Sequence, residues 1–136
     1  MKEISRILLT AAVLVFCLAG CRVIRVEEGN KQDLEYEVVQ EEALPREIKE
    51  LIQQKKENEF QMVYQNEEFL YLIKGYGRQM TGGYSIRIEE LSVSETAVFF
   101  STRLMGPSQE EKKSSEPSYP YIVVKISYRE EPVQFQ

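Results

Sequence analysis

The chain contains no histidine and no tryptophan, and only two of its 136 residues are cysteine. Without histidine there is no His-based catalytic triad, and the usual zinc and copper ligand sets are excluded. Asp33 is the only aspartate. The glutamates often occur as neighbours, such as Glu89-Glu90, and neighbouring residues of a strand point to opposite faces. We therefore expect no enzyme, with no catalytic residue, no metal and no cofactor, although composition alone leaves a Ser/Lys hydrolase open.

Several nucleotide- and metal-binding motifs are also absent. No calcium-binding loop and no P-loop occurs, and Gly75-Tyr76-Gly77 lacks the third glycine of a dinucleotide-binding loop. The formal net charge is −5. An acidic protein is poorly suited to binding nucleic acid or anionic lipid surfaces. We therefore expect no nucleic-acid partner.

The amino terminus has the layout of a secretion signal. Lys2 and Arg6 precede the uncharged run Ile7 to Phe16, which is followed by Leu18-Ala19-Gly20-Cys21. A membrane-spanning helix needs about 18 or more apolar residues, and this run is shorter. Residues 1–20 are therefore predicted to be a signal peptide. An ordinary signal peptide with an incidental Cys21, or an uncleaved anchor, remains the alternative.

The last four of these residues resemble the lipobox of bacterial lipoproteins. That resemblance implies that Cys21 becomes the first residue after cleavage and carries acyl chains such as palmitate. Cys17 would be removed, so no thiol would remain for a disulfide. Cleavage removes Lys2, Glu3 and Arg6, a net charge of +1, which changes the formal charge from −5 to −6. The predicted location is outside the cytoplasm, on the bacterial membrane, held by the lipid-modified cysteine.

After Cys21 we expect a tether and one domain. Residues 21–33 mix charges without an apolar period and form the predicted tether, which spans at most roughly 40 Å. Residues 34–136 form the predicted domain, which is long enough for one modest core. The predicted fold is α+β, a mainly antiparallel sheet or small β-sandwich of six or seven strands with one packed helix.

Alternating and continuous apolar runs predict the strands, and apolar residues three and four apart predict the helix. Leu34–Val38 reads as an edge strand, and the unbroken run Phe69–Ile73 reads as a central one. The apolar stripe of the helix is expected to face its own core, with a partner-binding helix as the alternative. The remaining elements are a helix over Pro45–Glu57 and strands over Phe60–Gln65, Tyr84–Glu89 (with the apolar pattern continued by Leu91 and Val93), Ala97–Leu104, Tyr121–Tyr128 and Val133–Phe135.

Two pairs of glycines mark the centre of the chain. Gly75 and Gly77 predict a bend or bulge, and Gly82-Gly83 predicts a turn that leads directly into a strand. Tyrosines on rigid turns provide contact area at low entropic cost, so this turn is a candidate recognition surface. The alternative is a structural loop whose rings pack back on the core. The candidate partner-binding residues are Tyr76, Met80, Thr81, Gly82, Gly83 and Tyr84.

Two segments carry a resemblance to a known family. Gly75–Ile86, with its Thr-Gly-Gly-Tyr-Ser turn, and Ser118–Ile126, with Pro-Tyr before an apolar strand, are similar to the C-terminal domain of the PrcB family. The similarity extends over roughly Phe60 to Phe135. One departure is Met80, which stands where such sequences often have a proline.

The resemblance implies a function through binding. The PrcB family is named for a lipoprotein of a bacterial surface protease complex, where it is an accessory subunit and not the protease. We therefore expect a non-enzymatic surface lipoprotein that binds a protein partner and serves as an accessory or stabilising subunit. A chagasin-like protease inhibitor, using Thr81–Tyr84 as its loop, and a module that binds cell-wall or small ligands are the alternatives. The polar segment Gly106–Ser118 is expected to be a mobile loop.

Overall fold

A computed structural model describes residues 30–108 and 116–136. The predicted signal peptide, Cys21 and most of the predicted tether lie outside the described residues, as does the centre of the Gly106–Ser118 loop. The predictions for these segments are therefore not addressed by the structure. Within the described residues, no helix is long and apolar enough to span a membrane.

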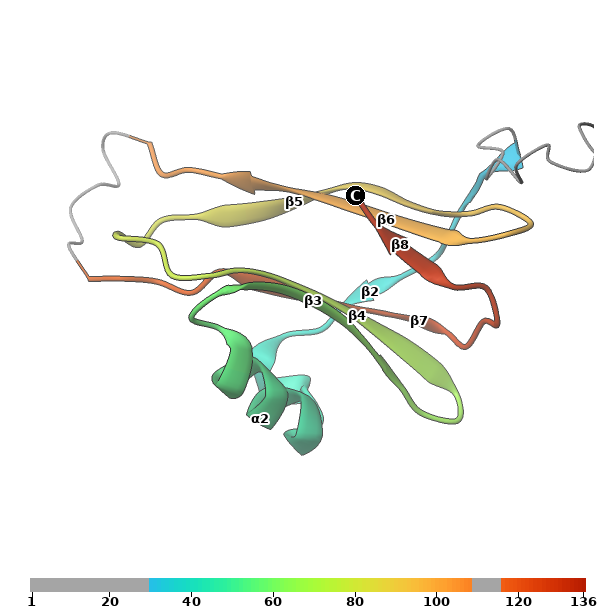
Figure 1. Cartoon of the computed structure of the whole chain (residues 1–136), viewed down its shortest axis with the longest axis horizontal. Helices are drawn as coiled ribbons and strands as arrows, with labels where there is room; N and C mark the ends of the chain where they lie inside the picture. Colours follow the sequence, from blue (N-terminus) through green and yellow to red (C-terminus); the bar gives the residue numbers. More distant parts are fainter. Residues whose placement is uncertain (1–29, 109–115) are drawn as a thin grey trace, which may run out of the picture.

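The described residues form two four-stranded sheets that stack face to face, with one α-helix on the outside (Figure 1). The first sheet contains, in spatial order, β1 (Gln32–Asp33), β5 (Ser85–Val93), β6 (Val98–Met105) and β8 (Val133–Phe135). The second sheet contains β2 (Glu37–Val38), β7 (Tyr121–Ser127), β4 (Phe69–Tyr76) and β3 (Glu59–Gln65). All neighbouring strands are antiparallel except β6 and β8. The predicted α+β sandwich is confirmed.

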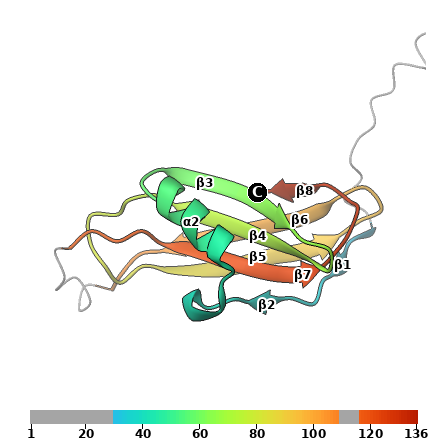
Figure 2. The same ribbon diagram turned by 90° about the horizontal axis from the view of Figure 1, so that it is seen from below.

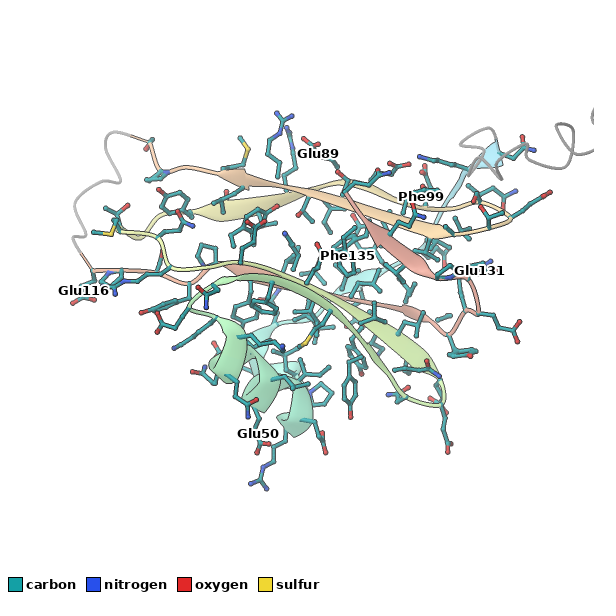
Figure 3. All side chains as sticks on the ribbon, in the orientation of Figure 1. Glu50, Glu89, Phe99, Glu116, Glu131 and Phe135 are labelled. Atoms are coloured by element: carbon teal, nitrogen blue, oxygen red, sulfur yellow. The ribbon has the colours of Figure 1, made fainter. Side chains whose placement is uncertain are left out.

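The main core lies between the two sheets. Alternate residues of β4 and β7 point inward and meet apolar side chains of β5 and β6. Phe100 and Phe135 meet edge to face at 5.8 Å between ring centres, and Figure 3 shows Phe135 in the space between the sheets. The fully or largely buried members of this cluster are Leu70, Leu72, Leu91, Val93, Val98, Phe100, Ile122, Val124 and Ile126.

A second apolar cluster lies between the second sheet and the helix. The helix α2 (Arg46–Lys55) follows the short 3₁₀ helix η2 (Glu41–Ala43) and begins after Pro45, whose carbonyl accepts the Ile48 and Lys49 N–H groups. Ile48 and Ile52 lie one turn apart and are completely or almost completely buried. They pack on a cluster that includes Tyr71, Ile73 and Val123. The helix therefore covers its own domain's sheet, as its apolar stripe predicts.

The helix explains why β4 reads as an unbroken apolar run. Its inward residues Leu70 and Leu72 belong to the core between the sheets, while Tyr71 and Ile73 belong to the helix-side cluster. β4 also has a strand on each side, β3 and β7. The prediction of a central strand buried on both faces is confirmed, and the strand continues to Tyr76, beyond the predicted end at Ile73.

A β-bulge explains the spacing of apolar residues in β5. Ile86 and Ile88 alternate with exposed residues, but the next buried residue is Leu91, three positions on. The pairing of β5 with β6 shifts between Ile88 and Glu90. The extra residue changes which face the following side chains occupy, so Leu91 and Val93 return to the core.

The amino-terminal part of the domain crosses from one sheet to the other, which the sequence did not predict. Gln32–Asp33, assigned above to the tether, pairs with β5. Leu34 still donates its N–H to the Leu91 carbonyl, whereas Glu37–Val38 pairs with β7 in the second sheet. The predicted strand Leu34–Val38 is therefore wrong as one element, because its two ends belong to different sheets. Its place at an edge is correct for β2.

Candidate functional site

The candidate loop connects β4 in the second sheet to β5 in the first, at one end of the sandwich (Figure 1). Two of its glycines, Gly77 (φ 74°) and Gly83 (φ 83°), have backbone angles that residues with a side chain rarely adopt. β5 begins at Ser85, one residue after the predicted start of the strand at Tyr84. The prediction that a glycine turn leads into a strand is confirmed.

Gly75 is a correction to the predicted bulge. It pairs in register with Phe60 on one side and Tyr121 on the other, so β4 is regular at this point. A Cβ atom at Gly75 would lie 2.1 Å from the Phe60 ring. Glycine is therefore required because the Phe60 ring lies flat against the backbone there, and only Gly77 makes the bend.

Ser118 holds the loop in place from a distant part of the chain. Gln79 and Ser118 form an isolated antiparallel bridge, with N–H to carbonyl distances of 2.8 and 3.0 Å. The Ser118 hydroxyl also donates to the Thr81 carbonyl at 2.6 Å. Within the loop, the Gln79 side-chain amide donates to the Tyr76 carbonyl at 3.0 Å. These bonds give the loop one defined conformation.

The two tyrosines of the loop have different surroundings. The Tyr76 hydroxyl hydrogen-bonds the Thr102 hydroxyl of β6, so this side chain lies between the sheets. The Lys74 ammonium lies 5.2 Å from the centre of the Tyr76 ring. Tyr84 is partly exposed, and its ring lies beside Gly106. Tyr76 thus packs back on the domain, as the structural alternative for this loop states.

Met80 is the exposed apolar tip of the loop. Its exposed fraction is 76%, the largest among the large hydrophobic residues that the structure describes as exposed. Gly83, three residues on, is also exposed, while Thr81, Gly82 and Tyr84 are half-buried. Of the six candidate residues, the contiguous segment from Met80 to Tyr84 forms the accessible surface. Tyr76 lies between the sheets, where its hydroxyl bonds Thr102.

Ion pairs near this end of the sandwich place two cations close to β6. Lys74 bonds Glu59 at 2.7 Å, and its side chain is only 13% exposed. Arg103 bonds Glu89 at 2.8 Å on the outer face of the first sheet, where Figure 3 shows Glu89. Both cations therefore have an acidic partner within the domain.

A third ion pair fixes the start of the domain to the first sheet. The Lys31 ammonium bonds the Glu90 carboxylate at 2.9 Å and lies 4.1 Å from the centre of the Phe99 ring. Ser92 also donates to Glu90 at 2.8 Å. The hydrogen bond from Lys31, followed by that from Ser92, lowers the pKa of Glu90.

Outside the candidate loop, the helix side of the second sheet carries a depression and a tyrosine with a shifted pKa. No group of three or more acidic or sulfur ligands that could hold a metal occurs in residues 30–108 and 116–136. A depression of about 210 Å³ is lined by Glu41, Lys49, Ile52, Gln53 and Tyr121. Burial, followed by repulsion from Glu41 and Glu42, raises the pKa of the Tyr121 hydroxyl.

Residues 70–127 match the family model described as PrcB C-terminal. The match supports assigning this part of the chain to the PrcB C-terminal family. The match begins at the second residue of β4 and ends at the last residue of β7. It therefore includes the candidate loop and Ser118, which holds it. Searches of curated proteins and of solved structures gave no match.

The glycines predict the loop, but no pattern in the sequence predicts the residues that hold it in place. Gln79 and Ser118 are 39 positions apart, and no local pattern in either segment announces their bridge. The same holds for the bond from Tyr76 to Thr102, which depends on the stacking of the two sheets. Both contacts arise from the topology, and the only signal in the sequence was that the PrcB resemblance includes both Gly75–Ile86 and Ser118–Ile126.

Proposed function

We propose that this protein is a non-enzymatic surface lipoprotein that binds another protein, as an accessory or stabilising subunit of an extracytoplasmic protease complex. The observation that carries the proposal is the PrcB C-terminal match over residues 70–127. Similarity to this family connects the domain in general with subunits of protease complexes. The protease as partner, the lipid anchor and the binding surface are our own proposals.

The binding surface in this proposal is the segment Met80–Tyr84. An exposed methionine and a partly exposed tyrosine on a turn offer apolar contact area. The bridge to Ser118 fixes the turn before binding, so little conformational entropy is lost when a partner docks. Tyr76 contributes by holding the loop against β6 through Thr102.

The anchor in this proposal is the lipid on Cys21, followed by a short tether. A lipid anchor restricts the domain to a thin layer at the membrane and raises its effective concentration for a partner at the same surface. This lets a modest interface suffice for binding. Localisation outside the cytoplasm follows from the predicted signal peptide.

The proposal is tested by purifying the tagged, full-length protein from native membranes in detergent and identifying co-purifying proteins by mass spectrometry. We expect the wild type to capture a protease and the Tyr84→Ala and Met80→Ala variants to capture much less. Gln53→Ala, on the exposed side of α2, is the control and should capture as much as the wild type.

Two results would contradict the proposal. If no protease is enriched with the wild type over an untagged sample, the role in a protease complex fails. If the protease is captured equally by the Tyr84→Ala and Met80→Ala variants, the complex stands but this segment is not its surface. A soluble domain that blocks a cysteine protease at micromolar concentration would instead favour an inhibitor.

A further inference from the structure

The edge of β6 is only partly covered. On one side, β5 pairs with β6 along its whole length, from Val98 to Met105. On the other side, β8 pairs only with Val98–Phe100. In Figure 2, β8 ends near the middle of the molecule, whereas β3 extends further to the left. Among the described residues, no strand pairs with the segment Ser101–Met105 on this side, which we call the open edge.

The hydrogen bonds to β8 show which backbone groups face the open edge. The Val98 N–H donates to the Pro132 carbonyl at 2.8 Å, and the Phe100 carbonyl accepts the Gln136 N–H at 2.9 Å. Backbone groups of every second residue point to the same side of a strand. Thr102 and Leu104 therefore direct their N–H and carbonyl groups to the open edge, where no backbone partner lies in the part of the chain that the structure describes.

The second sheet is also uncovered beneath this edge. β8 is an edge strand of the first sheet and β3 an edge strand of the second, and the two edges lie at the same side of the sandwich (Figure 2). β8 has three residues and β3 has seven, and the β3 side chains that face the first sheet are exposed at Gln61, Val63 and Gln65. Val63 is 41% exposed although it pairs with Leu72, which is completely buried. A strand added in line with β8 would both pair with β6 and cover part of this row.

We propose that the open edge binds an extended segment of the partner protein as an added strand of the first sheet. This inference rests on the proposed function, which supplies a protein partner. A row of alternating N–H and carbonyl groups is recognised by another extended backbone. The edge also adjoins the candidate loop, because Met105 pairs with Ser85, the residue after Tyr84. One partner can therefore contact both.

The side chains beside the edge favour a segment without charge. Arg103 is paired with Glu89 on the outer face of the first sheet, and Lys74 is paired with Glu59 on the inner side. A segment that alternates apolar and uncharged polar residues would leave both ion pairs intact and place its apolar residues over Val63.

A second copy of the chain is a poorer occupant. Two open edges of five residues, paired antiparallel about a two-fold axis, would place Arg103 opposite Arg103. Each copy also carries a formal charge of −5. Both effects oppose such a pairing. A heterologous, uncharged segment that alternates apolar and polar residues is therefore the occupant to which the proposal commits.

The first test uses the peptide Val-Thr-Val-Thr-Val, acetylated and amidated, with Val-Thr-Pro-Thr-Val as the control that cannot pair. Amide hydrogen exchange of the purified domain is followed by NMR. We expect the first peptide to slow exchange of the Thr102 and Leu104 amides by about tenfold at saturation, because each amide would gain one hydrogen bond. The control peptide should leave both rates unchanged. No slowing up to the solubility limit of the peptide, or equal slowing by both peptides, would overturn the proposal.

The second test separates this inference from the proposed function. Leu104→Ala keeps the backbone N–H and Leu104→Pro removes it, so the two variants differ at the open edge, and circular dichroism confirms that both are folded. In the membrane purification described above, we expect Leu104→Ala to retain most of the captured protease and Leu104→Pro to lose most of it. Equal capture by both would overturn the edge proposal and leave the protease complex intact. If even the wild type captures no protease, the proposed function fails, and the peptide experiment alone decides whether the edge accepts a strand.

Discussion

Individual residues in this domain are constrained by very local geometry. Gly75 leaves room for the Phe60 ring. Gly77 makes a turn, and a Cβ atom added there would lie 2.9 Å from the Glu59 nitrogen and 3.0 Å from the Asn58 carbonyl carbon. These glycines look alike in sequence, but one is required for packing and the other for its backbone angle. Substitution at each therefore has a different physical cost.

Replacing Gly75 by alanine is expected to destabilise the domain. The new Cβ would lie 2.1 Å from the Phe60 ring, which must move away from its place beside the helix-side cluster. Overpacking of this kind costs about 1–3 kcal/mol in the free energy of unfolding. Urea denaturation of the domain measures it. Gly106→Ala is the matched control, because its nearest atom is 3.9 Å away, and it should be neutral or slightly stabilising. Equal midpoints for the two variants would contradict the packing role of Gly75.

Glu90 should make stability depend on pH. Hydrogen bonds from Lys31 and Ser92 lower the pKa of Glu90 in the folded state below its ordinary value of 4.5. A carboxylate with a lowered folded pKa adds stability that is fully present above the unfolded pKa and is lost as pH falls through the folded pKa. The wild type should therefore lose more stability than Glu90→Gln between pH 6 and pH 3. The two variants are compared by urea midpoints, and parallel pH curves would rule out this contribution.

At the scale of elements, alternation and continuity of apolar residues predicted most of the fold. The strands β3, β4, β7 and β8 and the helix α2 follow their patterns, because each has one consistent relation to a core. The segment Leu34–Val38 fails because its pattern does not show that the chain changes sheets between Leu34 and Glu37. The open edge of β6 was also invisible, since it depends on how far β8 extends beside it.

The helix α2 should contribute to stability through its buried face. Ile48 is completely buried between the helix and the second sheet. Ile48→Ala removes this contact and leaves a cavity, which costs about 2–5 kcal/mol. Gln53→Ala, on the exposed side of the same helix, should change the free energy of unfolding by less than about 0.5 kcal/mol. Thermal or urea unfolding gives both values. A small loss for Ile48→Ala would mean that the helix is only loosely docked on its own sheet.

The whole molecule combines a folded sandwich with a predicted lipid anchor. The sandwich presents the Met80–Tyr84 segment and the open edge of β6 at the same end, since Ser85 pairs with Met105. The sequence led to the loop through its glycines and tyrosines. It did not lead to Ser118, Thr102 or Lys74 as neighbours of that loop, because those contacts depend on the stacking of two sheets.

Removal of the predicted lipid site should release the protein from membranes. In Cys21→Ser, no thiol is available for acylation, and we expect the protein to move from the membrane fraction to the soluble extracytoplasmic fraction or to retain its signal peptide. Metabolic labelling with a palmitate analogue should mark the wild type and not the variant. Cys17→Ser is the control and should remain labelled and membrane-bound. Labelling that persists in Cys21→Ser would contradict the lipobox assignment.

The most direct measurement of the central claim is casein hydrolysis by two preparations of this protein. One is purified in detergent from its native membranes, and the other is produced in a foreign host without its partners. If the protein is an accessory subunit without catalytic residues, we expect the native preparation to hydrolyse casein and the isolated chain not to. Hydrolysis by the isolated chain would show that the protein is itself a protease, and an inactive native preparation would contradict its place in a protease complex.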